Sequence, residues 1–469
     1  MDILHYPAKD RRPEEVWTQE TLDMAVSTVE LWQQAAGSFG NLHLHSCWGV
    51  SSVLDKRYAG ESSFMYPRLM HLFIDFYNRF GSKKWKRLAS SLVLQLEYLQ
   101  AENGGFIHSV NEFEPNFTTA GCPIHYFSPV LALYEYYEWE AGDPEIKELI
   151  PSMIDRHWQF ILRSSWGVGN GRFHPLGHPG WCGVTNQDLT AIAACARHGQ
   201  VFGDWSRYEQ YGKPTLDYIL SPACYYEKIG RFERGDGVNF TERMAYYVVI
   251  LTQLKDIYAC VKDERIPPVI DNVCAHLLDG TYQGGDGMTH IARGAQTDPE
   301  DENRILGWDT SSVAFDAYPG ILLHLKEYLS RHPEAKQIKE KTEELRRTLA
   351  AYVFADGSIP TGFNPKNHLF PIVTKPNLSD WIPFLLSELG PNVREPKPVK
   401  LPPLHRTYLD MVWKQNGPLW AVEKDGVRLY GGYTRYVAGI THGPEEKPVF
   451  GSFDSLEEVS ILEQVEGTP

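Results

Sequence analysis

The sequence predicts a mainly α-helical protein, an (α/α)6 toroid in which about twelve helices form a double ring, with a small β element near the C-terminal end. Two observations predict this fold. A Gly-rich polar loop followed by an apolar helix, as in residues 229–253, recurs at irregular intervals of about 55 to 70 residues. In addition, short turns and long loops alternate between successive helices.

Apolar residues at helical spacing define the individual helices. The predicted helices cover, in order, residues 17–36, 63–80, 83–100, 125–140, a return helix ending at 162, 186–201, a helix ending near 220, 241–260, a helix ending at 278, 310–329, 333–354 and 378–389.

The short turns decide how these helices are arranged. Turns such as Gly81-Ser82 and Gly203-Asp204 imply antiparallel neighbours, so every long loop should fall at one end of the bundle. The long loops lie near residues 45, 110, 175, 235, 290 and 360. A closed ring with one mouth and an open solenoid both fit this alternation. The His, Trp and acidic residues in the loops favour the ring.

Composition changes after the last predicted helix. We predict a toroidal catalytic domain over residues 1–390, a Pro- and Lys-rich linker over 391–403 and a small β-rich extension over 404–469.

Bulk composition limits the kinds of partner. The formal net charge of −15 argues against nucleic acid, although a local basic cleft can still bind an anionic substrate. We find no secretion signal and no apolar run approaching about 18 residues, so no membrane partner is expected. The seven cysteines are scattered, which favours free thiols and a cytoplasmic protein. The oligomeric state is not predicted.

One segment carries a family resemblance. The run Trp181-Cys-Gly-Val-Thr-Asn186, followed by a helix of small residues, resembles the Trp-x-x-Val-x-Asn segment of heparinase II/III-like and alginate-lyase-like polysaccharide lyases. Residues 237–254 are similar to the Gly- and Tyr-rich loop and helix of those enzymes. The helical repeat is shared with unsaturated-glucuronyl hydrolases. The resemblance implies a carbohydrate-active enzyme that cleaves glycosidic bonds in a uronate-containing oligo- or polysaccharide.

Such lyases remove the proton α to the uronate carboxylate and expel the 4-oxygen, so they need a carboxylate neutraliser and proton-transfer groups. The resemblance implies that Asn186 is the neutraliser. Tyr246 and His125 are the candidate proton-transfer residues, and His125 opens a predicted helix that should face the mouth. The family commonly has a Tyr where this sequence has Phe240, and this difference weakens the transfer of that role.

Further loop residues have side chains suited to binding a sugar or its carboxylate. The candidates for substrate binding are His108, His174, His178, Trp181, Arg234, Arg243, Trp308 and Asp309. Each can also serve local packing, and Asp309 is a candidate helix N-cap.

Two other functions stay open. A glycoside hydrolase would need a carboxylate pair across the cleft, for which Asp188 and Glu242 are the candidates, although acids in a first helical turn are often only caps. A non-catalytic sugar-binding protein would need the aromatic residues alone. The combination of Asn186, His125, Arg234 and Glu242 is richer in proton-transfer groups than binding requires.

We predict no cofactor. The group His43-x-His45-x-Cys47 has ligand-type residues, but its spacing matches no standard zinc pattern, so no metal site is assigned. No phosphate-binding loop or Rossmann fingerprint occurs in a strand–helix context.

Overall fold

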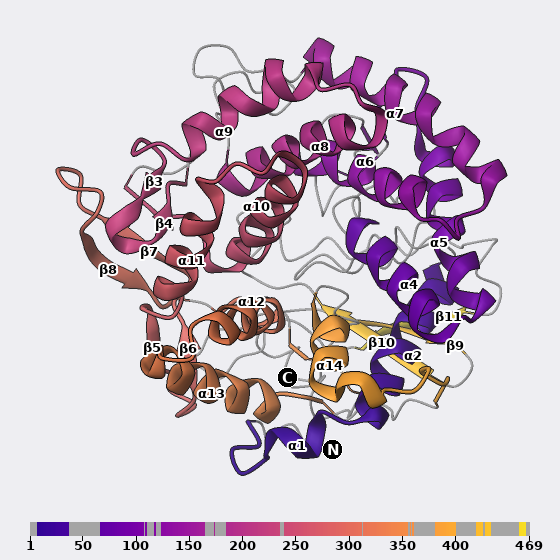
Figure 1. Ribbon diagram of the computed structural model, residues 1–469. Coiled ribbons are helices and arrows are strands. Elements are labelled where there is room, and N and C mark those ends of the chain that lie inside the picture. Colours follow the sequence, from indigo (N-terminus) through magenta and orange to yellow (C-terminus); the bar gives the residue numbers. More distant parts are fainter. Residues whose placement is uncertain are drawn as a thin grey trace.

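The computed structural model describes residues 7–36, 66–106, 123–164, 184–234, 239–311, 313–354 and 380–399, several short strands outside these ranges, and a few single residues. Twelve of the described helices form two concentric rings, which confirms the predicted toroid (Figure 1). The inner ring consists of α4 (Tyr66–Phe80), α6 (Pro123–Glu138), α8 (Thr185–Phe202), α10 (Tyr247–Val261), α12 (Tyr318–Arg331) and α14 (Trp381–Leu389). The outer ring consists of α2 (Gln19–Ala36), α5 (Lys83–Leu99), α7 (Pro144–Ser164), α9 (Lys213–Ile219), α11 (Ile266–His276) and α13 (Lys336–Ala351).

Short turns join each inner helix to the outer helix that follows it. The turn after α4 contains Gly81, and α8 ends at Gly203, both with positive φ (69° and 75°). Glycine adopts this left-handed conformation without steric strain and so ends a helix sharply. As predicted, these turns leave the long connections to lead into the inner helices.

Inner helices are apolar around most of their circumference because they contact neighbours on several sides. By length and composition alone, Met244–Val261 would suffice to cross a membrane. In this fold the stretch contains α10, which packs against α8, α11 and α12. Its apolar character is therefore that of a core helix.

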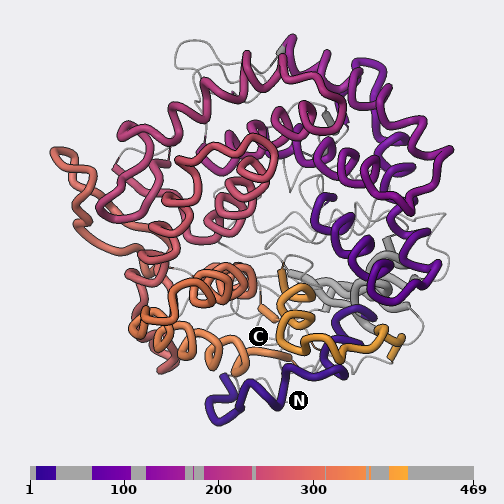
Figure 2. Tube along the Cα trace, in the orientation of Figure 1, coloured from indigo at the N-terminus to yellow at the C-terminus, as the bar shows by residue number. Residues whose placement is uncertain are grey.

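The ring closes between helices from opposite ends of the sequence. α14 packs on α2, and the Trp17 and Phe384 rings meet edge to face with centroids 5.2 Å apart. The backbone of 394–399 then follows α2, where the Arg394 N–H donates to Gln19 Oε1 (2.9 Å) and the Val399 N–H to Ser27 Oγ (2.9 Å). Figure 2 shows these indigo and orange segments side by side.

Short antiparallel strand pairs occur in the connections between the helices. They are β1 (His108–Ser109) with β2 (Phe117–Thr118), β3 (Tyr225–Tyr226) with β4 (Arg231–Phe232), β5 (Thr281–Gln283) with β6 (Thr289–Ile291), and β7 (Gly294–Thr297) with β8 (Ile305–Asp309). The expected C-terminal β element is a sheet of β9 (Leu419–Lys424), β10 (Val427–Gly432) and β11 (Val459–Val465), in the order β10-β9-β11. The domain boundaries stay predictions.

Two predicted helix starts are wrong. The predicted helix over 241–260 begins only at Tyr247, after a 3-10 turn over Met244–Tyr246. The predicted helix over 310–329 begins at Tyr318, after a 3-10 turn over Phe315–Ala317, and residues 305–309 form β8. Asp309 is therefore not a helix N-cap; it ends a strand and accepts a hydrogen bond from the Ser311 N–H at 3.0 Å.

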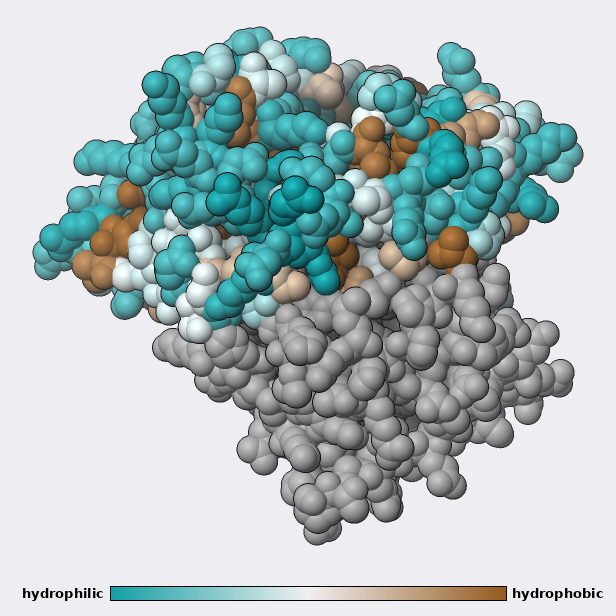
Figure 3. Space-filling model, turned by 90° about the horizontal axis from the view of Figure 1, so that it is seen from below, coloured by the Kyte–Doolittle hydropathy of each residue, from teal (hydrophilic) through white to brown (hydrophobic). Residues whose placement is uncertain are grey.

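On the face drawn in Figure 3, hydrophilic residues predominate over the described part, and apolar residues form small separate groups. This surface agrees with the acidic composition.

Candidate active site

The inner helices begin at one end of the ring, which we call the mouth. Arg68 in the first turn of α4 faces Asp380 at the start of α14, with 3.9 Å between Arg68 Nη2 and Asp380 Oδ2. That carboxylate lies against Gly320 in the first turn of α12, beside Val248 of α10. The starts of four inner helices therefore lie together.

The start of α8 joins the same end through strand β4. Thr185, the first residue of α8, donates from Oγ1 to the carbonyl oxygen of Glu233 at 2.8 Å. The Phe232 N–H donates to the hydroxyl of Tyr247, the first residue of α10 (2.9 Å). Residues 232–234 thus connect the starts of α8 and α10.

A buried ion pair forms next to this connection. Arg234 Nη1 lies 2.6 Å from Glu242 Oε1, and the side chains are 12% and 0% exposed. The Arg243 N–H donates to the same carboxylate oxygen at 2.9 Å. Glu233 bridges to Thr241 in antiparallel register, so Arg234 lies opposite Phe240 and Glu242 lies opposite Phe232. Arg234 and Glu242 are therefore diagonal neighbours on one face of this bridge, within reach of their long side chains. Both residues were candidates from the sequence, but the sequence did not indicate that they form an ion pair.

Tyr246 lies near the same guanidinium. The Arg234 Cζ atom is 5.4 Å from the centroid of the Tyr246 ring, a distance suited to a cation–π contact. Tyr246 closes the 3-10 turn that leads into α10. A phenol and a carboxylate-binding cation thus lie beside each other at the mouth.

A second group of charges lies next to this turn. The Met244 N–H donates to the Arg293 carbonyl oxygen (2.7 Å), and Arg293 Nη1 lies 4.0 Å from Asp309 Oδ2. Burial opposes ionisation of Asp309, but the Ser311 hydrogen bonds and the charges of Arg293 and Arg243 outweigh it and lower the pKa of the carboxyl. Arg234, Arg243 and Arg293 therefore gather near the start of α10, on a protein of net charge −15.

Asn186 and Asp188 lie in the first turn of α8 and are buried. The Asn186 backbone carbonyl accepts a hydrogen bond from Thr190 Oγ1 at 2.9 Å. Its side-chain Oδ1 is buried and has no hydrogen-bond partner among the described residues. Buried amide oxygens are normally paired, so this oxygen stands out among the described side chains of α8.

The aromatic candidates differ in exposure. The Trp308 ring packs over Gly280, where a Cβ atom would lie 2.5 Å from it, and faces the buried Arg231 guanidinium at 5.7 Å. These contacts are those of a packing residue. Phe240, at the position where the lyases that this sequence resembles commonly carry a Tyr, is 46% exposed.

The remaining candidates are placed only in part. His125 is the third residue of α6 and is half-buried. His108 belongs to β1, where it pairs with Thr118. His174, His178, Trp181 and the group His43, His45 and Cys47 lie outside the described residues. Within the described ranges, no three His, Cys, Asp or Glu side chains gather as a metal site would require.

Sequence reasoning missed Arg68 and Asp380. An Asp immediately before a helix is usually an N-cap, and an Arg in a first turn carries no distinguishing signal. Gly320 was the available hint, because a Gly in an otherwise apolar helix often marks a close approach.

The sequence matches no family model and no curated protein. Its structure is similar to a sugar epimerase from a ruminal bacterium, with a TM-score of 0.56 and 11% identity over 81% of this chain and 99% of that chain. An unsaturated glucuronyl hydrolase specific for heparin gives 0.50 and 12%, covering 79% of this chain and 96% of the other. A D-mannose isomerase gives 0.50 and 8%, covering 69% and 86%. At these identities the comparisons show the fold, which is the (α/α)6 toroid of carbohydrate-active enzymes.

Proposed function

We propose that this protein is a carbohydrate-active enzyme that cleaves a glycosidic bond in a uronate-containing oligo- or polysaccharide by β-elimination. The observation that carries the proposal is that Arg234 contacts both the buried Glu242 carboxylate and the Tyr246 ring. The fold neighbours support the wider class, because they include an epimerase, an isomerase and a glucuronyl hydrolase that act on sugars.

The elimination needs three tasks at the mouth. Arg234 and Arg243 hold the uronate carboxylate, and Asn186 donates a hydrogen bond to it as negative charge grows. Tyr246 exchanges protons with the substrate, with His125 as the second candidate. The C5 proton leaves, a C4–C5 double bond forms, and the bond from C4 to its oxygen breaks as that oxygen takes a proton. Fixed donors aimed at the developing charge are a large source of rate enhancement.

The ion pair also bears on hydrolysis, the alternative reaction. A hydrolase needs one carboxyl group that carries a proton to the leaving oxygen. Glu242 Oε1 accepts hydrogen bonds from the Arg234 guanidinium and the Arg243 N–H, and both favour the ionised form. Glu242 is therefore better suited to positioning Arg234 than to acting as a general acid. If Glu242 only positions Arg234, a hydrolase that used Asp188 would need a different carboxyl group to complete its acid–base pair.

The state of the cysteines bears on the compartment in which the protein works. Cys195, Cys224, Cys260 and Cys274 are thiols rather than disulfides. We propose that the enzyme works in a reducing compartment on imported oligosaccharides.

One experiment separates the reactions. Purified protein is incubated with a panel of uronate oligosaccharides and neutral disaccharides, and three signals are followed: ultraviolet absorbance, new reducing ends and sugar configuration by NMR. Absorbance rising together with reducing ends supports elimination, because the new C4–C5 double bond is conjugated to the carboxylate. Reducing ends without absorbance overturn elimination in favour of hydrolysis. A change of configuration without cleavage overturns both in favour of epimerisation, and tight sugar binding without any product indicates a binding protein.

A further inference from the structure

Asp380 occupies the N-cap position of α14 but does not use its side chain as a cap. Its backbone carbonyl accepts the Phe384 N–H at 2.8 Å, while the carboxylate makes no cap hydrogen bond. An Asp at this position normally accepts from an N–H of its own first turn and so stabilises the helix. The carboxylate of Asp380 is directed elsewhere.

The side chain instead points across the mouth toward α12 and α4. A Cβ atom on Gly320 would lie 2.3 Å from Asp380 Oδ2, so only glycine at position 320 leaves room for this carboxylate. Arg68 Nη2 lies 3.9 Å from the same oxygen, which is too far for a direct hydrogen bond. Asp380 Oδ2 itself is buried and has no hydrogen-bond partner among the described residues.

This arrangement leaves a donor and an acceptor facing each other across a gap. A buried charged oxygen without a hydrogen bond is unfavourable, so this position favours a ligand atom that can donate one. One oxygen atom lying between the two groups can reach hydrogen-bond distance from both, because the separation is 3.9 Å. A hydroxyl group fits this role, since it can donate to Asp380 Oδ2 and accept from Arg68 at the same time.

The pair is only partly buried. The two side chains keep partial exposure, 24% for Arg68 and 20% for Asp380, although they come from inner helices on opposite sides of the chain closure. The charge of Arg68 also contributes to lowering the pKa of His324, which lies one turn beyond Gly320 on α12. The pair therefore lies where the starts of α4, α10, α12 and α14 meet.

We propose that Arg68 and Asp380 form a subsite at the mouth that binds a hydroxyl group of a sugar ring. This proposal rests on the proposed function in one respect, namely that the mouth receives a carbohydrate. It adds a recognition element that does not depend on the uronate carboxylate. The subsite should therefore bind neutral and uronate sugars alike.

The test measures binding of neutral and uronate disaccharides by isothermal titration calorimetry to the full chain. Asp380→Asn keeps the size of the side chain and removes its charge, whereas Arg68→Gln removes the charge and shortens the side chain. Both should weaken binding of both sugars by about tenfold or more, since a hydrogen bond to a charged group contributes about 1.5–3 kcal/mol. Arg79→Gln is the matched control, because Arg79 pairs with Asp75 on the outside of the same helix (2.7 Å) and should leave affinity unchanged.

The outcomes separate the subsite from the proposed reaction. Variants that fold with unchanged melting temperature and bind both sugars as the wild type does would overturn the subsite, as would a wild type that binds neither sugar. If only uronate binding is weakened, Arg68 recognises a carboxylate and the hydroxyl subsite is wrong. Sugar binding that depends on Arg68 and Asp380, without any elimination product, would support the subsite and sink the proposed function.

Discussion

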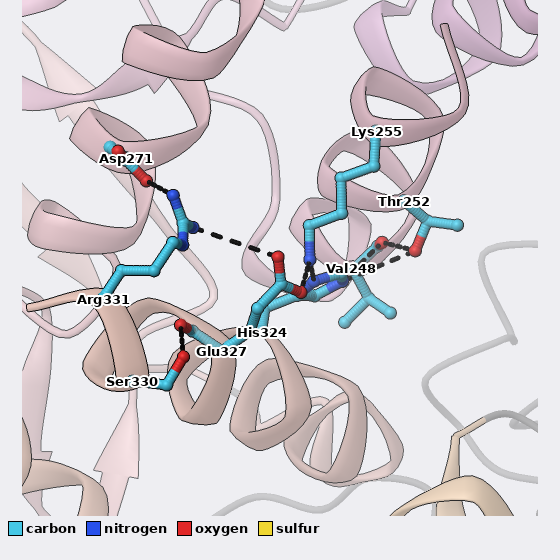
Figure 4. Close-up of polar contacts among 8 residues, drawn as sticks. All are labelled: Val248, Thr252, Lys255, Asp271, His324, Glu327, Ser330 and Arg331. Atoms are coloured by element: carbon cyan, nitrogen blue, oxygen red, sulfur yellow. Dashed lines mark hydrogen bonds and ion pairs between the residues drawn. The ribbon is translucent and has the colours of Figure 1, made fainter. Parts of the chain in front are cut away.

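Lys255 on α10 and His324 on α12 are joined by a hydrogen bond of 2.9 Å from Lys255 Nζ to His324 Nδ1 (Figure 4). The same ammonium group pairs with Glu327, and Arg331 continues the chain of charges to Asp271 at 2.6 Å. His324 Nε2 faces the Val248 carbonyl oxygen at 3.3 Å. Two neighbouring inner helices are thus cross-linked by a neutral, buried histidine.

This histidine should make the protein sensitive to acid. Burial, together with the charge of Lys255, lowers the pKa of His324 to about 3. In the unfolded chain the pKa is about 6.5, so between these values the unfolded state binds the extra proton and stability falls as pH decreases. Urea unfolding at pH 7 and pH 5 should show this loss. His324→Gln should reduce the pH dependence by up to about 1.4 kcal/mol per pH unit, and an unchanged slope would contradict the assignment.

The Arg234–Glu242 pair should contribute to both stability and activity. Glu242→Gln leaves Arg234 without its buried counter-charge, and breaking such a pair typically costs about 3–5 kcal/mol. We expect a lower unfolding free energy and a large loss of elimination rate. Arg243→Gln serves as the comparison for stability alone, because Glu242 contacts the backbone N–H of Arg243, which that substitution keeps. Equal stability of Glu242→Gln and the wild type would show that the ion pair is not needed for folding.

Asn186→Ala should separate catalysis from folding. The Asn186 Oδ1 atom has no hydrogen-bond partner among the described residues, so its removal should change the melting temperature little. The loss of one donor to a developing charge should lower the elimination rate on the order of a hundredfold or more. Full activity in this variant would remove Asn186 from the mechanism.

A buried polar network under α12 and α13 should matter for stability alone. His290 Nε2 lies 2.7 Å from Asp286 Oδ2, and the Tyr352 hydroxyl donates to the same oxygen at 2.5 Å. Burial opposes ionisation of Asp286, but these hydrogen bonds outweigh it and lower its pKa. This contribution is present above the unfolded pKa of about 4 and is lost as pH falls through the lower folded value.

Asp286→Ala should therefore destabilise the fold by about 3 kcal/mol or more, because it leaves His290 and Tyr352 without their partner. The variant should keep its sugar affinity at low temperature. Thermal unfolding and calorimetric titration of the same sample check the two statements, and a selective loss of affinity would place the network in the site.

Gly320→Ala tests whether the Asp380 carboxylate needs the space beside Gly320. Replacing Gly by Ala in a helix usually stabilises it by about 0.5–1 kcal/mol. Here the added Cβ would lie 2.3 Å from Asp380 Oδ2, so the carboxylate must move away from Arg68. We expect weaker sugar binding and no gain in melting temperature. A variant that is more stable and binds sugar normally would show that sugar binding does not require the carboxylate to lie beside Gly320.

The sequence allowed the ring to be predicted because its helices alternate with turns of distinct length. The turn at Gly81 and the end of α8 at Gly203 are local events, so local residues specify them. The predicted starts of α10 and α12 were wrong because a 3-10 turn precedes each helix, over Met244–Tyr246 and Phe315–Ala317, and sequence patterns fix helix boundaries poorly.

The site was predictable only as a set of residue types. Arg234 and Glu242 could be named from the loop they share, but their ion pair depends on the register between residues 233 and 241. Asp380 and Arg68 lie at the two ends of the described ring. Their proximity depends on closure of the ring, for which no short stretch of sequence carries a signal.

Closure of the ring also has a consequence for the order of folding. The contacts that fasten the ring join residues about 375 positions apart, as between Gln19 and Arg394. Such contacts form late, because the entropy of bringing distant segments together must first be overcome. During synthesis on the ribosome, α2 and α4 emerge long before α14 is made. The apolar faces that α14 covers therefore stay exposed until then. Binding competence should therefore appear only when the last inner helix docks, and a chain shortened before α14 should depend on chaperones to stay in solution.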